Sequence, residues 1–296
     1  MGKSILVTGS DGFIAQSLVK YLRSNGETVA TFDIKKNKFE DITSYESVYT
    51  FFNTYQPSEV YHLAAQAFVG PGEKDPYQDL KINGFGMINV LRCVKEFGSK
   101  LLYTSSGAVY GATNSFPHRE DAELVPMANY GCTKLLGEYY LRKWVLVEDI
   151  NAKIVRFSSV YGPNRGREGP VNVFLEKALA GETLTVYGDG SQTRDMVYIL
   201  DAIRGMKQVM NAGASGHAYN IGLGEEHSVL EVAQIVSELT GAKIEMVPKA
   251  LSKFDVLRSY FDITKAKNIG YLPEVSLKDG IKLTYEDMGL IEPKNL

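Results

Sequence analysis

The sequence lacks the residues that disulfide-rich or metal-binding scaffolds need. Its two cysteines, Cys93 and Cys132, lie far apart without the spacing of metal ligands, and its four histidines are scattered. We therefore expect a reduced, cytoplasmic protein without a structural metal. No apolar run approaches the roughly 20 residues of a membrane-spanning helix, and the N-terminus shows no signal-peptide pattern.

An excess of charge of either sign is also missing. The chain has 32 basic and 35 acidic residues, which gives a net charge of −3. This balance produces no overall field that would favour a nucleic acid or a membrane surface as partner, so any anionic ligand must be bound locally. With 44 % apolar residues in 296, the chain can form a large core.

What the sequence does contain is an alternation of short β-branched runs with amphipathic stretches, which is typical of βαβ units. We predict strands at 5–7, 28–32, 60–64, 100–104 and 153–157, and helices at 14–24, 44–55, 79–97 and 129–147. This order predicts an α/β fold with a doubly wound parallel (Rossmann) sheet.

After Gly162 the texture changes to a loop rich in Pro, Gly and Arg, then an amphipathic helix and a short strand at 184–187. We interpret this as a smaller, sequence-discontinuous C-terminal domain. Residues 194–198 and 217–221 read as strands that return to the first domain. The predicted division is 1–162, rejoined by about 191–222, for the first domain, and 163–190 with 223–296 for the second.

The first predicted strand ends in Thr8-Gly9-Ser10-Asp11-Gly12-Phe13-Ile14-Ala15. Glycines here let the backbone turn tightly and approach a pyrophosphate at the start of the next helix, although Ala15 replaces a common third glycine. An ordinary strand-to-helix turn is the alternative. Asp33 ends the second strand, where a carboxylate would accept hydrogen bonds from a ribose and repel a 2′-phosphate. This favours NAD over NADP, with Lys35 and Lys36 interpreted as solvated loop charges.

A second motif, Tyr130-Gly-Cys-Thr-Lys134, places a phenol and an ammonium on one face of a helix. The pair alone could be surface decoration. Tyr130 becomes a useful base only if its pKa falls from near 10, which an adjacent Lys134 ammonium and a cationic nicotinamide can bring about. A phenolate would then accept a proton from a sugar hydroxyl while a hydride passes to NAD.

At these residues the chain resembles the extended short-chain dehydrogenase/reductase family, and within it the NAD-dependent sugar-nucleotide epimerases and dehydratases, of the UDP-glucose 4-epimerase kind. Tyr103-Thr-Ser-Ser-Gly-Ala-Val-Tyr-Gly111 is similar to the family's serine segment, and Gly188-Asp-Gly-Ser-Gln-Thr-Arg-Asp-Met-Val-Tyr198 to its diphosphate segment. The resemblance implies Ser106, Tyr130 and Lys134 as catalytic residues, NAD as cofactor, a nucleotide sugar as substrate and a homodimer. The dimer would form through the helices at 79–97 and 129–147.

The resemblance also implies binding residues. At cofactor positions it places Gly9, Gly12, Phe13, Ile14, Asp33, Asn37, Asp41, Ile42, Leu63, Ala64, Ala65, Thr104, Tyr130, Lys134 and Phe157. At substrate positions it places Ser106, Ser159, Val171, Thr185, Tyr187, Arg194 and Asp255, with Arg194 meeting the diphosphate through its planar fork.

Several positions depart from the family pattern. Ser159 and Lys81 each stand where the family usually has asparagine, and Ser252-Lys253-Phe254-Asp255 replaces a usual Arg-Pro-Gly-Asp. Gly107 and Ala108 stand where sugar dehydratases carry an acidic pair, which disfavours elimination and favours epimerisation at C4. The alternatives are a sugar-nucleotide reductase or dehydrogenase, a small-molecule dehydrogenase of the same family, and a non-catalytic nucleotide-binding protein. His62 is interpreted as structural and Cys132 as a small packing residue.

Overall fold

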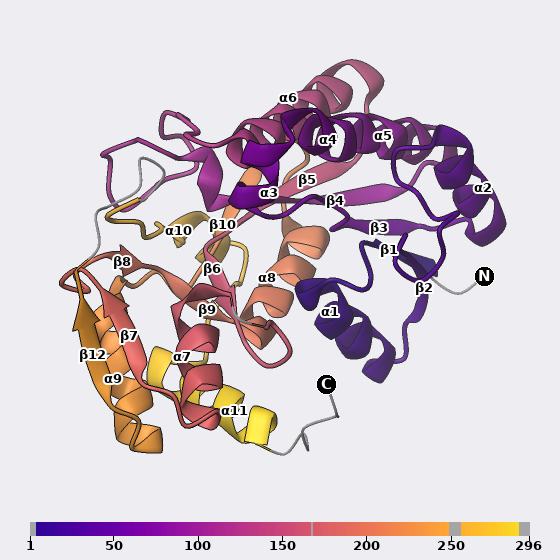
Figure 1. Cartoon of the computed structure of the whole chain (residues 1–296). Coiled ribbons are helices and arrows are strands. Elements are labelled where there is room, and N and C mark those ends of the chain that lie inside the picture. The colour runs from indigo at the N-terminus through magenta and orange to yellow at the C-terminus, as the bar shows by residue number, and fades with distance from the viewer. Residues whose placement is uncertain (1–3, 167, 249–255, 290–296) are drawn as a thin grey trace.

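The computed structural model describes residues 4–166, 168–248 and 256–289. Its centre is a six-stranded sheet in which all neighbouring strands are parallel (Figure 1). Across the sheet the strands are β2 (Thr28–Phe32), β1 (Ser4–Thr8), β3 (Glu59–His62), β4 (Lys100–Ser106), β5 (Ala152–Phe157) and β10 (Ala218–Ile221). The predicted doubly wound parallel sheet is confirmed, including the strand that returns near 217–221.

The topology brings the predicted site together at one edge of the sheet. β1 pairs with β2 on one side and with β3 on the other, so the crossovers change direction at β1. Ligands of such sheets bind at the carboxyl ends of the strands near this switch point. In the register Thr8 lies beside His62 and Ser106 beside Phe157, which places the glycine turn and the predicted catalytic serine at the same edge.

Helices cover both faces of this sheet (Figure 1). α1 (Phe13–Ser24) and α8 (Ile199–Ala212) contact each other on one face, whereas α2 (Tyr45–Tyr55), α5 (Gly86–Phe97) and α6 (Asn129–Glu148) follow one another on the other. Strand residues alternate between the two cores, because side chains along a strand point to opposite faces. In β1, for example, Ile5 and Val7 belong to one core and Leu6 to the other.

The segment between β3 and β4 is more broken than the single helix predicted over 79–97. It contains α3 (Val69–Lys74), α4 (Pro76–Leu80), the π-helical turn η1 (Lys81–Phe85) and then α5. Asp75 caps α4 by accepting a hydrogen bond from the Gln78 backbone. A π turn inserts an extra residue into a helix and is frequent at functional sites. Here the turn contains Asn83, which is buried.

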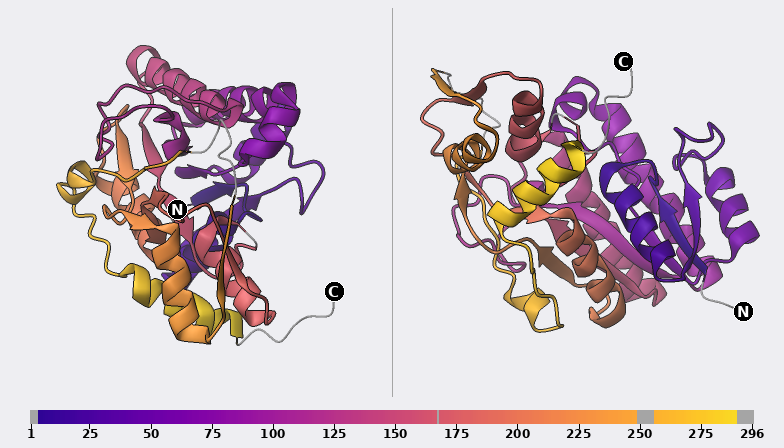
Figure 2. Two further views of the ribbon diagram at one scale, coloured as in Figure 1. Left: turned by 60° about the vertical axis from the view of Figure 1, so that its left-hand side comes forward. Right: turned by 90° about the horizontal axis from the view of Figure 1, so that it is seen from below.

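Most of the elements after Gly162, apart from α8, β10 and the short helix α10, form a smaller group below the left end of the central sheet in Figure 1. In it α7, α9 and α11 pack on one another, and Figure 2 shows α11 beside the other two. Short strand pairs complete the group: β7 with β12, β8 with β11, and β6 with β9. The bounds are β6 (Ser159–Tyr161), α7 (Gly169–Leu179), β7 (Leu184–Tyr187), β8 (Thr193–Arg194), β9 (Met196–Tyr198), β11 (His227–Ser228), α9 (Val229–Thr240), β12 (Ile244–Val247), α10 (Thr264–Lys267) and α11 (Leu277–Gly289), with η2 (Gly107–Val109) earlier in the chain.

The prediction of a single strand over 194–198 is wrong. The chain instead forms two short strands that pair outside the sheet, β8 with β11 and β9 with β6. The reason lies in Asp195 between them, which is buried and bent inward. Its carboxylate accepts hydrogen bonds from the backbone N–H groups of Leu223, Gly224 and Phe261.

The division into two domains at the predicted boundaries stays a prediction. Within the described residues, no helix combines the length and the apolar character that crossing a membrane requires.

Candidate active site

The turn after β1 can exist only with glycine at position 9. Gly9 has a φ of +67°, and a Cβ there would lie 2.6 Å from the Cα and N of Ala64. The turn therefore lies directly against the end of β3. The hydroxyl oxygen of Ser10 is buried without a hydrogen-bond partner among the described residues. A close backbone approach and an unused buried hydroxyl both fit the pyrophosphate of a dinucleotide at the start of α1.

Asp33 closes one side of this turn. Its carboxylate is buried and accepts hydrogen bonds from the backbone N–H groups of Asp11 and Lys35, each at 2.8 Å. Lys36 is about half exposed, and its ammonium lies 3.9 Å from the Asp11 carboxylate. Lys36 is therefore directed toward a carboxylate instead of being left to bind the 2′-phosphate of NADP, which agrees with NAD as the cofactor.

The carboxyl ends of three strands are joined beneath the turn. The hydroxyl of Thr8 lies 2.8 Å from Nδ1 of His62, and Thr104 donates to the His62 carbonyl at 2.9 Å. Burial and the nearby Lys134 lower the pKa of His62 to about 3, so its ring is neutral and its role is structural. These bonds fix the strand ends that carry the predicted cofactor residues Leu63, Ala64 and Thr104.

The remaining predicted cofactor residues lie around the same edge. Asn37 and Asp41 cap backbone turns in the loop after β2, and Ile42 is buried. A Cβ on Gly86 would lie 2.9 Å from Ile42, so α5 approaches this loop closely. The others occupy strand ends, the loop after β3 or the start of α1: Gly12, Phe13, Ile14, Ala65 and Phe157.

The three predicted catalytic residues meet where α6 begins. Ser106 ends β4 and accepts a hydrogen bond from the backbone of Ala108 at 3.2 Å, while Tyr130 lies in the first turn of α6 and Lys134 one turn later. The Ser106 hydroxyl lies close enough to Tyr130 to act toward lowering its pKa. Gly131 permits this approach, because a Cβ there would lie 2.7 Å from the Ala108 carbonyl oxygen.

The expected effect of Lys134 on Tyr130 needs a correction. Burial raises the pKa of Tyr130, and the influences that lower it come from Ser106 and Arg165. The Lys134 ammonium lies instead 4.7 Å from the centre of the Tyr103 ring, almost fully buried. Burial lowers the pKa of Lys134 to about 7, although Asp79 and Glu138 act to raise it.

A buried ion pair supports the helix behind Lys134. Glu138, one turn further on, accepts hydrogen bonds from Arg156 at 2.9 and 2.8 Å and from the Ser105 hydroxyl at 2.6 Å. Glu138 and Arg156 are both fully buried. Burial alone would raise the pKa of Glu138, but the bonds and charge of Arg156 outweigh it and hold the pKa below its ordinary value.

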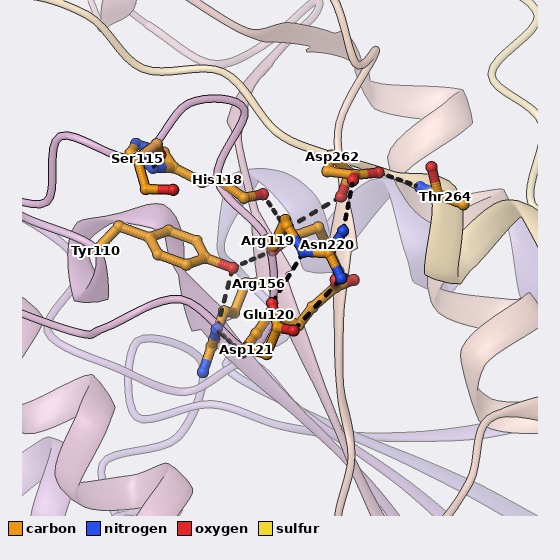
Figure 3. A network of polar contacts seen from close by, with 10 residues as sticks. All are labelled: Tyr110, Ser115, His118, Arg119, Glu120, Asp121, Arg156, Asn220, Asp262 and Thr264. Carbon is orange, nitrogen blue, oxygen red and sulfur yellow. Dashed lines mark hydrogen bonds and ion pairs between the residues drawn. The ribbon is translucent and has the colours of Figure 1, made fainter.

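Arg156 continues this network toward the other end of the chain, as Figure 3 shows. It donates to the Tyr110 hydroxyl at 3.0 Å, which donates to Asn220 at 2.7 Å. Asn220 in turn donates to the carbonyls of His118 and Asp262. Hydrogen bonds thus connect β5, which carries Arg156, to β10 and to the segment before α10.

Sequence reasoning missed Asp79, Asn83, Gly131 and the Glu138–Arg156 pair. A signal existed for Glu138, which stands four residues after Lys134 on the same helix face. It also misjudged Cys132, which is exposed rather than packed because its neighbours Gly131 and Thr133 occupy the inward face.

The predicted substrate residues lie mostly in the smaller group of elements. Ser159 opens β6, Val171 is buried in α7, and Arg194 lies in β8. In β7, the Thr185 hydroxyl accepts from Lys177 at 2.8 Å and Tyr187 is half exposed. Asp255, with Ser252, Lys253 and Phe254, lies outside the described residues.

Comparison with known proteins shows the same family throughout. The pattern of the NAD dependent epimerase/dehydratase family matches residues 5–222. The UDP-glucose 4-epimerase of Mycolicibacterium smegmatis is 32 % identical over 95 % of this chain and 97 % of its own. The Thermotoga maritima UDP-glucose 4-epimerase structure with UDP-glucose has a TM-score of 0.90 at 33 % identity, covering 96 % of this chain and 97 % of that one.

A further structure, the Bacillus cereus UDP-glucuronic acid 4-epimerase with UDP-glucuronic acid and NAD, has a TM-score of 0.86 at 28 % identity. It covers 97 % of this chain and 99 % of that one. The chain therefore belongs to the NAD-dependent epimerase/dehydratase family and is an NAD-dependent enzyme of the extended short-chain dehydrogenase/reductase type.

Proposed function

We propose that the protein is an epimerase of a nucleoside-diphosphate sugar, which it oxidises at C4 to a transient keto sugar and reduces again from the other face. The observation that carries this proposal is the arrangement of Ser106, Tyr130 and Lys134 at the strand edge, with Gly107 and Ala108 following the serine. Neither of these two residues can protonate a leaving hydroxyl, so elimination is disfavoured.

In this proposal the glycine turn and Asp33 hold NAD, which supplies the hydride acceptor and donor of the reaction. Ser106 orients the C4 oxygen by hydrogen bonding. Tyr130 accepts the proton of the C4 hydroxyl. It returns this proton to the C4 oxygen after the keto sugar has rotated in the site and presented its other face to the cofactor. The positive charge of Arg165 favours the phenolate form that this step needs, and Lys134 is assigned to hold the nicotinamide ribose.

The nucleotide part of the substrate is assigned to the smaller group of elements. Arg194 is proposed to bind the diphosphate, because a guanidinium matches two phosphate oxygens at once. Ser159 is proposed to lie on the diphosphate side, and Val171, Thr185 and Tyr187 are proposed to contact the nucleoside. The relatives bind UDP-glucose and UDP-glucuronic acid, which supports a nucleotide sugar in general and leaves the sugar to experiment.

A panel of UDP-, GDP-, CDP- and dTDP-sugars tests this function. We expect NMR of the purified NAD-loaded protein with one of these sugars to show conversion to its C4 epimer. Absorbance at the NADH band should show no net change during that conversion. Steady accumulation of NADH would identify a dehydrogenase instead, and binding of a nucleotide sugar without any conversion would indicate a non-catalytic protein.

We also propose a homodimer formed through α5, α6 and the η1 turn. Large apolar side chains are exposed there, including Phe85 at 59 %, Tyr139 at 59 % and Leu146 at 85 %. Light scattering should therefore give twice the chain mass at micromolar concentration. Tyr139→Glu should shift the protein toward monomer, whereas Leu272→Glu, at an exposed apolar residue before α11, should not. A wild-type protein that is monomeric under these conditions would reject the dimer.

A further inference from the structure

A buried carboxylate lies behind the helix turn that carries Tyr130 and Lys134. Asp79 of α4 is fully buried, and both of its oxygens accept hydrogen bonds. Oδ2 accepts from the Thr133 hydroxyl at 2.7 Å, and Oδ1 accepts from the amides of Gln66 at 2.8 Å and Asn83 at 3.4 Å. All three donors are uncharged, so the bonds hold the carboxylate in place without neutralising it.

Thr133 connects this carboxylate to the catalytic turn. It lies between Tyr130 and Lys134, and its hydroxyl is also 3.1 Å from the Tyr130 carbonyl and 3.0 Å from the Asn83 amide. The amide of Asn83 donates in addition to the Gln66 carbonyl at 3.0 Å. A shift of the first turn of α6 would therefore break bonds to Asp79 and Asn83 together.

The same region also holds the start of α6, which has no side-chain cap of its own. Glu73 of α3 accepts a hydrogen bond from the Asn129 backbone at 2.8 Å, and Asn129 donates to the Gly72 carbonyl at 3.3 Å. Hydrogen bonds to the segment 66–83 thus hold the N-terminal turn of α6 in place.

Charged and titratable groups on several elements surround Tyr130 and Lys134. Glu138 of α6 is a second buried carboxylate near Lys134, but it is paired with Arg156 and Arg142. Asp79 acts to raise the pKa of both Tyr130 and Lys134. The other titratable or charged neighbours are Tyr103 of β4, His62 of β3, Cys132 of α6 and Arg165 of the loop after β6.

Building on the proposed function, we propose that Asp79 is a positioning residue for the catalytic pair. Through Thr133 it fixes the first turn of α6, and its buried charge sets the protonation of Tyr130 and Lys134 together. Removal of a negative charge favours the deprotonated form of every nearby group. Without Asp79 the pKa values of both groups therefore fall, and the whole pH–rate profile moves to lower pH.

Asp79→Asn tests this with little change in shape. The amide oxygen can still accept from Gln66 and Asn83, and the amide nitrogen can donate to Thr133, whose hydroxyl then donates to the Tyr130 carbonyl. We expect both limbs of the kcat/KM profile against pH to fall by on the order of one unit. Asp75→Asn, a matched change at the exposed cap of the same helix, should leave both limbs in place.

Thr133→Val separates the charge from the hydrogen bond. It keeps the Asp79 carboxylate and removes only the hydroxyl that connects it to α6. We expect kcat to fall while both limbs stay at their wild-type positions. Equal shifts in Thr133→Val and Asp79→Asn would mean that alignment alone moves the limbs, and would overturn the electrostatic role of Asp79.

A titration without substrate keeps this test independent of the proposed function. The ultraviolet difference between the NAD-loaded protein and its NAD-loaded Tyr130→Phe variant isolates the phenolate of Tyr130. The midpoint of this difference should fall when Asp79→Asn is present in both proteins, and Asp79→Ser offers the same measurement should the amide variant not fold. An unchanged midpoint would overturn the proposal for any substrate. A shifted midpoint in a protein that converts no nucleotide sugar would reject the proposed function alone.

Discussion

A Tyr130→Phe protein should turn over its substrate about 10³-fold more slowly than the unchanged protein, because a positioned general base contributes an effect of this order. The substitution removes one hydroxyl and keeps the ring that lies in the first turn of α6. NAD affinity should therefore change little. Steady-state rates on a nucleotide sugar that the unchanged protein converts measure the first effect, and calorimetry with NAD measures the second.

Tyr140→Phe is the matched control for this experiment. Tyr140 lies on the same helix, well beyond the turn that carries Tyr130 and Lys134, and it is more than one-third exposed. Its loss of a hydroxyl should therefore leave the rate unchanged. Near-normal turnover by Tyr130→Phe would refute the role of Tyr130 in proton transfer, and a different base would then be needed.

Arg156→Met should lower the free energy of unfolding by about 3–5 kcal/mol, because it leaves the fully buried Glu138 without its principal partner. Denaturant unfolding at neutral pH measures this loss. Arg142→Met removes the more exposed partner of the same carboxylate and should cost at most about 1 kcal/mol. Arg156→Met combined with Glu138→Leu should recover part of the loss, because no buried charge then remains unpaired.

The pH dependence of this loss has a definite sign. Arg156 holds the pKa of Glu138 below its ordinary value in the folded protein. The pair therefore contributes stability above the unfolded-state pKa, near 4.3, and that stability is lost as pH falls through the lower folded-state pKa. Without Arg156, burial raises the folded-state pKa of Glu138 above its value in the unchanged protein. The difference in unfolding free energy between Arg156→Met and the unchanged protein should therefore shrink as pH falls from the raised pKa of the variant to the lowered pKa of the unchanged protein. Unfolding free energies within about 1 kcal/mol of each other at neutral pH would show that the ion pair does not have this weight.

The parts of the fold that the sequence predicts correctly are those with local signals. Buried apolar runs identify β1, β4 and β5, and helical spacing of Leu18 and Leu22 identifies α1. The glycine turn is equally local, since Gly9 must have a positive φ and must touch Ala64. The family resemblance predicts the serine, tyrosine and lysine as catalytic residues, and the structure brings the three to one edge of the sheet.

The parts that sequence reasoning missed depend on pairing between distant residues. Asp79 and Thr133 are 54 positions apart in the sequence, and the residue periodicity of neither helix predicts that they form a hydrogen bond. The π turn at Lys81–Phe85 is also not predicted by helical spacing, although a Cβ on Gly84 would lie 2.9 Å from the Leu80 side chain. The break between β8 and β9 arises because Asp195 bends inward to backbone groups of later segments. Tertiary contacts determine these features and override the local conformational preferences of the sequence.

The position of β10 at the edge of the sheet limits how this enzyme can be divided. Its residues 218–221 cover the outer edge of β5, and Asn220 reaches the Tyr110 hydroxyl across 110 positions. A fragment that stops at residue 162 would therefore end in an uncovered strand whose residues are all of the buried kind, an invitation to pair with other chains. During synthesis the outer edge of β5 therefore stays uncovered until about sixty further residues, up to β10, have left the ribosome. The six-stranded sheet is continuous in space but not along the chain, so a single cut cannot release it intact.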